Sequence, residues 1–336
     1  MFFLTGLLGM MAIGSIALVG TSTAETSEPE ADAPPPGSPS PGDETGFVPE
    51  EGLFARIGAI NSLDEDSPDD ASASREAAQN RTGTEGTDFL QGAGGDDQIS
   101  GKAGDDALMG GAGDDSLDGG IGDDIVNGEE GADLIVGDEG QDSLVGAAGN
   151  DLLDGGAGSD TLQGCLGDDM MDGGGDDDRL MGREGNDSLT GGTGEDTLFG
   201  GWDNDLLDGT VTDQDGVDRD TGDYLNGGDG DDVIITGSGD TVHGGEGKDS
   251  IILGQWITEH AADLTDFDAE QDQLIVVYDD SNPDIKPVLE TRASSDDPEL
   301  SEIVVNGTVL AQMPTKDLPD IDAIFMIGES MSGEAK

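Results

Sequence analysis

Aspartate recurs at every ninth residue over residues 83–208, and this spacing gives the sequence its clearest chemistry. Fourteen nine-residue repeats (nonads) run there without a gap, and each has Gly at its first position, Asp at its sixth and Leu, Ile, Val or Met at its eighth. Carboxylate oxygens are preferred ligands of hard cations. The sixth-position residues are therefore candidate metal ligands, namely Asp88, Asp97, Asp106, Asp115, Asp124, Asp133, Asp142, Asp151, Asp160, Asp169, Asp178, Asp187, Asp196 and Asp205.

The repeat continues less regularly to residue 252. Residues 209–226 lose the Gly/Asp pattern but have the length of two nonads, so the phase is kept and the motif returns at Asp223 and Leu225. Two more nonads, 227–235 and 244–252, flank a shortened unit of eight residues, 236–243. Further candidate ligands are Asp223, Asp232, Asp240 and Asp249, and four aspartates of the irregular stretch form a candidate loop site of a different kind: Asp213, Asp215, Asp218 and Asp220.

The charge balance limits the class of partner. The chain has 77 Asp and Glu against 12 Lys and Arg, which gives a formal net charge of −65 at pH 7. Such a charge repels itself in a compact state and also repels nucleic acid, so the fold needs bound cations and a nucleic-acid partner is excluded. Cys165 is the single cysteine, and the two histidines are His243 and His260, so the sequence offers neither an intrachain disulfide nor a Cys/His zinc site.

The elements that position these aspartates follow from the nonad itself. Each nonad reads as a glycine-rich turn of six residues followed by a strand of three, because glycine suits turns and costs about 1 kcal/mol in a helix relative to Ala. Two nonads then make one coil of 18 residues. Coils stack as parallel strands about 4.8 Å apart, so the eighth-position side chains form two inward ladders and the turns form two columns. Aspartates of adjacent coils should meet in these columns.

The metal that such turns suit is calcium. Two Asp side chains and backbone carbonyls of the glycine-rich turns can supply the six or more oxygens that Ca²⁺ prefers, whereas Mg²⁺ demands tighter octahedral geometry. Without cations, the stacked carboxylates repel one another, and the small side chains of the repeat bury little apolar surface to offset the entropy of ordering the chain. The sequence therefore predicts folding that is coupled to calcium binding.

These nonads resemble the GGxGxDxUx motif of repeats-in-toxin (RTX) proteins, whose hemolysin-type repeats bind calcium. The resemblance implies an all-β fold, a right-handed parallel β-roll over residues 83–252. Residues 263–268 (DLTDFD), with Asp272 and Leu274, also resemble the strand that follows the roll in that family. Strands expected at 274–278, 288–292, 302–305, 308–312 and 323–327, with a hairpin turn at Asn306-Gly307, predict a small C-terminal β cap domain over 253–329, followed by a tail, 330–336.

The region before the roll has two parts. Residues 1–20 are apolar and uncharged, so residues 1–24 are read either as a signal peptide or as a membrane anchor, with segment 1–20 as a candidate membrane tether. Residues 25–82 are acidic and proline-rich, as is typical of a disordered linker, and contain a candidate short helix within 49–63. Trp202 and Trp256 are expected to pack at irregularities of the roll.

The functional reading is a calcium-binding secreted or cell-surface protein with a structural or adhesion-type role. No HExxH zinc motif or GxSxG nucleophile motif occurs, so we expect no enzymatic activity. The seventh positions carry no regular threonine array, which argues against an ice-binding solenoid. The alternative is an export or stabilising β-roll of a secreted protein whose C-terminal domain carries an unrecognised activity. Calcium ions are the expected partners, and the sequence names no protein partner.

Overall fold

The computed structural model describes residues 77–328 except 213–215, 219, 221, 259, 282–285 and 296. The predictions for residues 1–24, for the linker and its helix up to residue 76, and for the tail lie outside the described residues. Within those limits the chain is built of strands with two short 3-10 turns, η2 (Thr315–Asp317) and η3 (Ile321–Ala323). Among the residues described, no helix has the length and apolar character needed to cross a membrane.

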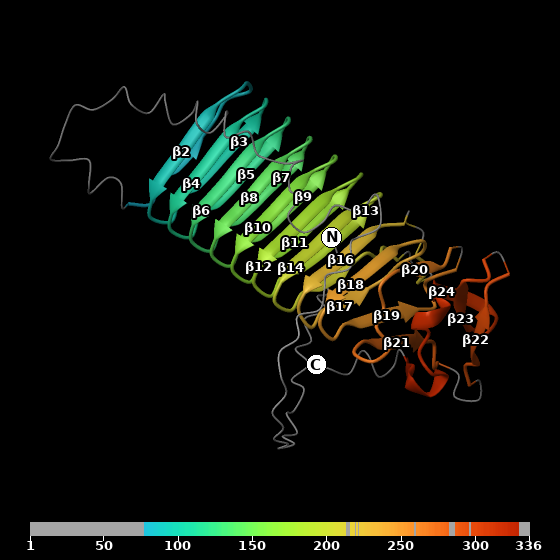
Figure 1. The fold of residues 1–336 in the computed structure, drawn as a ribbon. Coiled ribbons are helices and arrows are strands. Elements are labelled where there is room, and N and C mark those ends of the chain that lie inside the picture. Colours follow the sequence, from blue (N-terminus) through green and yellow to red (C-terminus); the bar gives the residue numbers. More distant parts are fainter. Residues whose placement is uncertain are drawn as a thin grey trace, which may run out of the picture. The chain divides into compact units, whose positions relative to one another are not determined.

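The repeats form short strands that follow one another along the chain at a nearly constant spacing (Figure 1). They are β1 (Asn80–Thr82), β2 (Phe89–Gly94), β3 (Gln98–Ala103), β4 (Ala107–Ala112), β5 (Ser116–Ile121), β6 (Ile125–Glu130), β7 (Leu134–Glu139), β8 (Ser143–Ala148), β9 (Leu152–Ala157), β10 (Thr161–Leu166), β11 (Met170–Gly175), β12 (Arg179–Glu184), β13 (Ser188–Thr193), β14 (Thr197–Trp202), β15 (Leu206–Asp208), β16 (Tyr224–Asp229), β17 (Val233–Ile235), β18 (Thr241–Glu246) and β19 (Ser250–Gly254).

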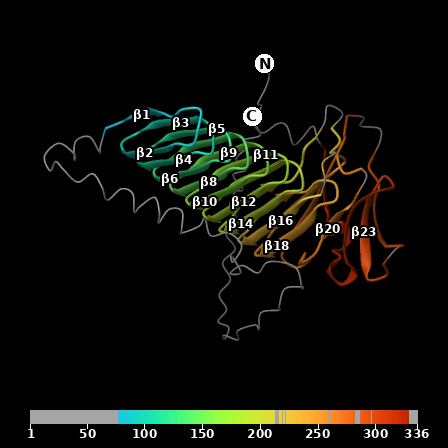
Figure 2. The same ribbon diagram turned by 90° about the horizontal axis from the view of Figure 1, so that it is seen from above.

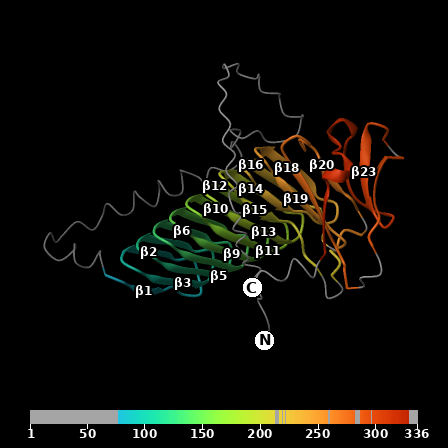
Figure 3. The same ribbon diagram turned by 90° about the horizontal axis from the view of Figure 1, so that it is seen from below.

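These strands alternate between two sheets. Odd-numbered strands from β1 to β19 pair in one sheet and even-numbered strands from β2 to β18 pair in the other, and every pairing is parallel. Figures 2 and 3 show the two rows of strands from opposite sides. Up to β14 each strand pairs with the one 18 residues away, as in Leu144↔Leu162 and Leu153↔Met171. The predicted right-handed parallel β-roll with two nonads per coil is confirmed.

The core lies between the two sheets and is made by the eighth positions, as predicted. From Ile99 to Ile251 these side chains are 0–3% exposed, and Leu90 in the first complete nonad is partly buried against them. Side chains alternate across a strand, so the seventh and ninth positions point away from this core. One apolar residue per nonad is therefore enough to fill the interior of so narrow a coil.

The strands are longer than the sequence suggested. We expected turns of six residues and strands of three, but β8, for example, spans six residues and the turn after it only three, 149–151. The strand continues because the second position takes positive φ while still pairing, as Gly156 (φ 102°) does with Gly174 (φ 103°). Cys165 holds the same position at φ 88°, so a side chain is tolerated there.

The irregular stretch provides one nonad's worth of strand instead of two. Leu198 pairs with Leu225, and Leu207 with Ile234, which are offsets of 27 residues instead of 18. Nine extra residues are therefore extruded between β15 and β16, and the described part of residues 209–222 adds no strand to either sheet. The phase is kept, as expected, because the extrusion equals one repeat. The eight-residue unit is confirmed by the offset of 17 between β16 and β18.

The roll also begins earlier than the first complete nonad. Strand β1 lies within the range assigned to the linker and pairs with β3, with Arg81 opposite Ile99. Arg81 holds an eighth position in this pairing, so the apolar pattern that marks the other repeats is lost there. The backbone amide of Gln79 at the sixth position still donates to Oδ1 of Asp97, which joins this incomplete repeat to the roll.

The C-terminal strands continue both sheets of the roll. Strands β20 (Ala262–Leu264) and β21 (Gln273–Tyr278) add in parallel to β18 and β19, and β25 (Phe325–Gly328) adds to β21. β24 (Thr308–Pro314) pairs with β20 and forms an antiparallel hairpin with β23 (Leu300–Val305) through the predicted turn at Asn306-Gly307. β22 (Leu289–Ala293) completes that edge. Buried Leu264, Leu274 and Ile303 carry the roll's core into this cap.

Candidate metal centres

The sixth-position aspartates form two continuous ladders, one in each column of turns. In each step the backbone N–H of one aspartate donates to Oδ1 of the aspartate in the next coil, for example Asp124 to Asp142 at 2.7 Å. One ladder runs through Asp88, Asp106, Asp124, Asp142, Asp160, Asp178, Asp196, Asp223 and Asp240. The other runs through Asp97, Asp115, Asp133, Asp151, Asp169, Asp187, Asp205, Asp232 and Asp249.

All the aspartates predicted as ligands are thus brought together in the two ladders, and most are buried. Except for Asp88, they are at most 3% exposed. Burial of an ionised carboxylate costs free energy unless it is paired or binds a metal ion. A single hydrogen bond to Oδ1 leaves the second carboxylate oxygen to be accounted for.

That second oxygen, Oδ2, finds no hydrogen-bond donor among the described residues at most ladder positions. It lies beside the first-position glycine of its own repeat, together with the carbonyl oxygen of the first-position glycine one coil on. A Cβ added at Gly155 would lie 2.6 Å from Oδ2 of Asp160 and 2.5 Å from the carbonyl oxygen of Gly173. At Gly119 the corresponding distances are 2.6 Å to Oδ2 of Asp124 and 3.1 Å to the Gly137 carbonyl oxygen.

The invariant glycine at the first position has a clear physical reason in this geometry. Any side chain there would collide with a buried carboxylate oxygen and a backbone carbonyl oxygen. Both atoms are acceptors, so neither can satisfy the other by hydrogen bonding. Acceptor oxygens that gather without a donor are the donor set that a hard cation such as Ca²⁺ takes as ligands, and the residues present fit such an ion.

The electrostatics of the ladders also favour a cation. Burial first, and neighbouring carboxylates second, raise the pKa of these aspartates above the ordinary value of 3.8, although each Oδ1 hydrogen bond acts in the opposite direction. The pKa is raised to about 6 at Asp115, Asp160, Asp187, Asp196 and Asp249, to about 7 at Asp124, Asp133, Asp142, Asp169, Asp232 and Asp240, to about 8 at Asp178 and Asp205, and to about 9 at Asp223.

Two ladder residues differ from the rest. At the N-terminal end, Oδ2 of Asp88 accepts hydrogen bonds from the amide and hydroxyl of Thr84, at 2.6 and 2.8 Å. Near the C-terminal end, Oδ2 of Asp240 accepts bonds from the Gly237 amide and the Thr236 hydroxyl, at 2.5 and 3.2 Å. Each carboxylate is satisfied by its own turn, so each needs a cation less than the aspartates between them.

One ladder member is missing from the set predicted from sequence. The backbone amide of Asp249 donates to Oδ1 of Asp272 at 3.1 Å, so the second ladder extends one step into the cap. Asp272 stands directly before Gln273 and the buried Leu274, and this Asp-x-Leu triplet is the signal that marks it as a sixth position. Its Oδ2 accepts the amide of Asp268 at 2.7 Å, which places it with the satisfied ends of the ladders.

The predicted loop site is only partly assembled. Asp213 and Asp215 lie outside the described residues. Asp218 is 2% exposed, and its carboxylate accepts the backbone amides of Val211 and Ser238, at 3.2 and 2.6 Å. It therefore serves as a hydrogen-bond acceptor that holds the loop. Asp220 instead approaches the first ladder, where its carboxylate joins those of Asp196 and Asp223.

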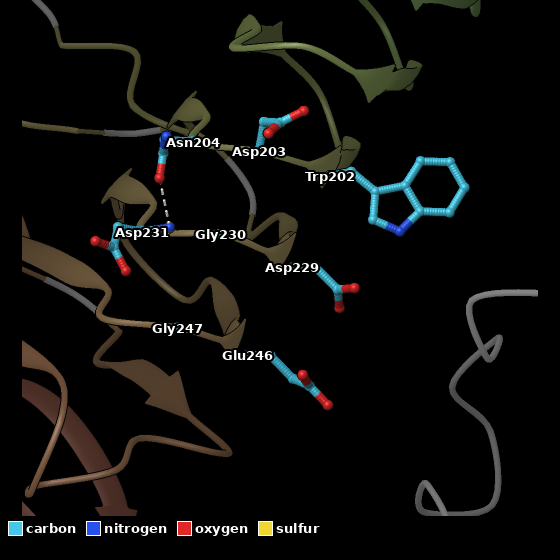
Figure 4. Close-up of a pocket in the computed structure, with 8 residues that line it drawn as sticks. All are labelled: Trp202, Asp203, Asn204, Asp229, Gly230, Asp231, Glu246 and Gly247. Carbon is cyan, nitrogen blue, oxygen red and sulfur yellow. Dashed lines mark hydrogen bonds between the residues drawn. The ribbon is translucent and has the colours of Figure 1, made fainter. Parts of the chain in front are cut away.

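A shallow pocket of about 580 Å³ lies over the ends of β14, β16 and β18. Figure 4 shows Trp202, Asp229 and Glu246 projecting to one side of it, while Asn204 accepts the Asp231 amide on the other. Trp202 is 54% exposed, so the expectation that it packs at an irregularity is wrong. It holds a third position, which points outward at the end of a strand. Trp256 does pack against the core, and its indole N–H donates to the Thr236 carbonyl at 2.9 Å.

Comparison with known proteins identifies the family. The sequence model of the RTX calcium-binding nonapeptide repeat, which describes four copies of the repeat, matches residues 82–117, 100–135, 110–144, 118–153, 136–171, 145–180, 172–207, 220–240 and 240–255. The matches leave out most of the extruded segment, where the structure breaks the repeat. Comparison with curated proteins gave no match. Through repeats that span residues 82–255, the chain belongs to the RTX calcium-binding nonapeptide-repeat family.

Proposed function

We propose that this chain binds calcium ions along both columns of turns, folds as they bind, and acts as a secreted or cell-surface protein with a structural or adhesion-type role instead of catalysis. The observation that supports it most is the row of buried Oδ2 atoms that meet carbonyl oxygens and, within the described chain, no donor. The family match supports calcium as the ion.

The proposed ligands are the sixth-position aspartates of both ladders. Each would supply Oδ2, and the first-position glycine of the next coil would supply a carbonyl oxygen. Oδ1 is already engaged by a backbone amide, which fixes the carboxylate and aims Oδ2 at the same point in every coil. A bound calcium ion supplies the positive charge that lets these carboxylates ionise while buried.

The satisfied residues define where the ion columns end. Asp88 and Asp240 remain proposed ligands, but we expect them to bind more weakly than the aspartates between them because their Oδ2 atoms already accept hydrogen bonds. In the same proposal, residues 253–329 act as a cap. Their strands cover the last coil of both sheets, and Asp266 accepts the amides of Gly244 and Gly245, at 2.9 and 3.1 Å.

Coupling between calcium and folding would make the protein respond to its compartment. Extracellular calcium modules bind in the range of about 10⁻⁴ to 10⁻³ M, well above cytosolic calcium. A chain with a net charge of −65 would then stay unfolded before export and become ordered outside the cell. The N-terminal segment 1–24, as signal or anchor, is part of this proposal.

Circular dichroism of the full chain, with chelator and then with millimolar calcium, tests the proposal. We expect a gain of β-structure with calcium and little change with magnesium at the same ionic strength. Magnesium separates ligation from simple screening of charge, because both ions carry the same charge. A chain that is fully folded in chelator, or equally folded by magnesium, would contradict calcium-dependent folding.

A further inference from the structure

The extruded segment changes how one turn of the roll is satisfied. In regular coils the fourth-position amide donates to a backbone carbonyl of the next coil, for example Gly140 to Ala157 at 2.9 Å and Gly158 to Gly175 at 3.0 Å. Gly194 is also a fourth-position residue, but its amide donates to Oδ1 of Asp220 at 3.0 Å. A side-chain carboxylate therefore stands where the regular roll has a backbone carbonyl.

This substitution brings a third carboxylate to one step of the ladder. Asp196 and Asp223 are neighbours in the ladder, with the Asp196 amide donating to Oδ1 of Asp223 at 2.9 Å. Carboxylate oxygens of Asp196, Asp220 and Asp223 all lie within 4.8 Å of one another. In the part of the chain that is described, no other group of three Asp, Glu, His or Cys side chains brings ligand atoms so close together.

A second observation indicates a ligand at this cluster. Asp196 and Asp223 are each 2% exposed, and within the described residues no donor reaches the Oδ2 atom of either one. Two buried acceptor oxygens therefore face a third carboxylate without a proton donor between them. Water, which can donate hydrogen bonds, solvates exposed acidic clusters, but these two side chains are almost fully removed from it.

We propose that Asp196, Asp220 and Asp223 hold one calcium ion in a site of their own, in which the extruded segment supplies the third carboxylate. The proposal rests on the proposed calcium binding of the ladders and adds a ligand that no repeat provides. Three carboxylates carry more negative charge than the two of a regular step, and affinity in oxygen-ligand sites rises with ligand charge. The ion should therefore bind here more tightly than at regular steps, and it would tie the extruded segment to the roll.

The test uses terbium, a lanthanide that takes oxygen ligands as calcium does and emits when a nearby aromatic ring transfers energy to it. The chain has two tyrosines and two tryptophans, and Tyr224 directly follows Asp223. The part of the terbium emission that disappears in Tyr224→Phe reports the site beside that ring. We expect this part to saturate at lower terbium than the gain of β-structure that the same titration shows by circular dichroism.

Asp220→Asn is the informative variant because the amide keeps an oxygen that can accept the Gly194 N–H. If Asp220 only replaces a backbone carbonyl, Asn should bind terbium as the natural chain does. If Asp220 is a ligand, the midpoint of the Tyr224-dependent emission should rise about tenfold or more, since removal of a charged ligand costs at least as much as the loss of a supporting group around a metal. The matched control is Asp177→Asn, an exposed aspartate whose Oδ1 accepts the Glu195 amide, also at 3.0 Å.

Circular dichroism at saturating calcium on each sample separates the two levels of the proposal. A natural chain that gains no β-structure in calcium contradicts the proposed function. A chain that folds in calcium, but whose Asp220→Asn variant binds terbium like Asp177→Asn, overturns only the three-carboxylate site. If Asp220→Asn does not reach the natural spectrum, Asp220→Glu takes its place, because it keeps the charge. A folded Glu variant without Tyr224-dependent emission would also overturn the site.

Discussion

Asp142→Asn separates two roles that the ladder geometry gives to each aspartate. Oδ1 of Asp142 accepts the backbone amide of Asp124 at 2.7 Å, whereas Oδ2 meets no donor in the described part of the roll. An asparagine oxygen can still accept the Asp124 amide, and the side chain loses its charge and its second acceptor. Alanine would remove both roles and leave the Asp124 amide unsatisfied, at a cost of about 1–3 kcal/mol.

The expected effects on the two states of the roll have opposite signs. Burial, together with the carboxylates of Asp160, Asp123 and Asp138, raises the pKa of Asp142 from 3.8 to about 7. At neutral pH this corresponds to a penalty of roughly 4 kcal/mol on the ionised carboxylate in the metal-free fold. Asn removes that penalty, so metal-free chain should be stabilised by up to this amount. Calcium loses a ligand, so the calcium midpoint of folding should rise about tenfold, or about 1.4 kcal/mol.

The assay is a calcium titration followed by circular dichroism, together with urea unfolding in chelator. Asp123→Asn is the control, because Asp123 is an exposed turn residue whose Oδ1 accepts only the Gln141 amide, at 3.0 Å. We expect the control to match the natural chain in both measurements. If Asp142→Asn had the natural calcium midpoint, the aspartates would be hydrogen-bond acceptors and not calcium ligands.

Three further outcomes follow from the same geometry. Because the ladder carboxylates have folded-state pKa values raised from 3.8 to about 6–9, the metal-free roll binds more protons than the unfolded chain, so in chelator its free energy of unfolding should fall as pH rises from about 4 to 8; urea unfolding at pH 5 and pH 7.5 checks this, and greater stability at pH 7.5 would contradict it. Gly155→Ala places a Cβ against the Gly173 carbonyl and Asp160 and should destabilise the calcium-bound roll by about 1–3 kcal/mol in thermal unfolding, whereas Gly86→Ala, with no atom within 4 Å, should not. A chain that ends at Leu253 exposes the last strands of both sheets and should aggregate or need more calcium, as light scattering and a calcium titration would show; a soluble monomer with the natural midpoint would argue against a capping role.

Much of this architecture could be predicted because one repeat corresponds to half a coil. A period of nine with an apolar eighth position leaves few ways to bury Leu144 and Leu153 except in two facing parallel ladders. The convergence of the aspartates follows from the same period, since Asp142 and Asp160 are one coil apart. The hairpin at Asn306-Gly307 could be predicted because its residues favour positive φ, at 53° and 91° in the structure.

The remaining features depend on the path of the backbone. The sequence indicates that Asp160 lies in a turn, but not that its Oδ1 is used by a backbone amide while its Oδ2 turns toward Gly155 and Gly173. The strand length was wrong because glycine usually marks a turn, whereas Gly156 keeps its place in the sheet at positive φ. An extruded segment whose excess equals one repeat leaves the phase unchanged, so spacing alone cannot separate one coil from two.

The irregular coils indicate which interaction sets the stacking of the roll. Adjacent coils are offset by 18 residues in the regular part, by 27 across the extrusion and by 17 across the short unit, and strands β15 and β17 shrink to three residues. The aspartate ladder passes through every one of these changes: Asp187 donates to Asp205 at 2.8 Å, Asp205 to Asp232 at 2.8 Å and Asp232 to Asp249 at 3.0 Å. Strand hydrogen bonds are lost at the irregular coils, but no ladder bond is. The step from one aspartate to the next, and not the length of the strand, is therefore the element that a coil must keep, and this places each proposed calcium ion at the contact that holds neighbouring coils in register.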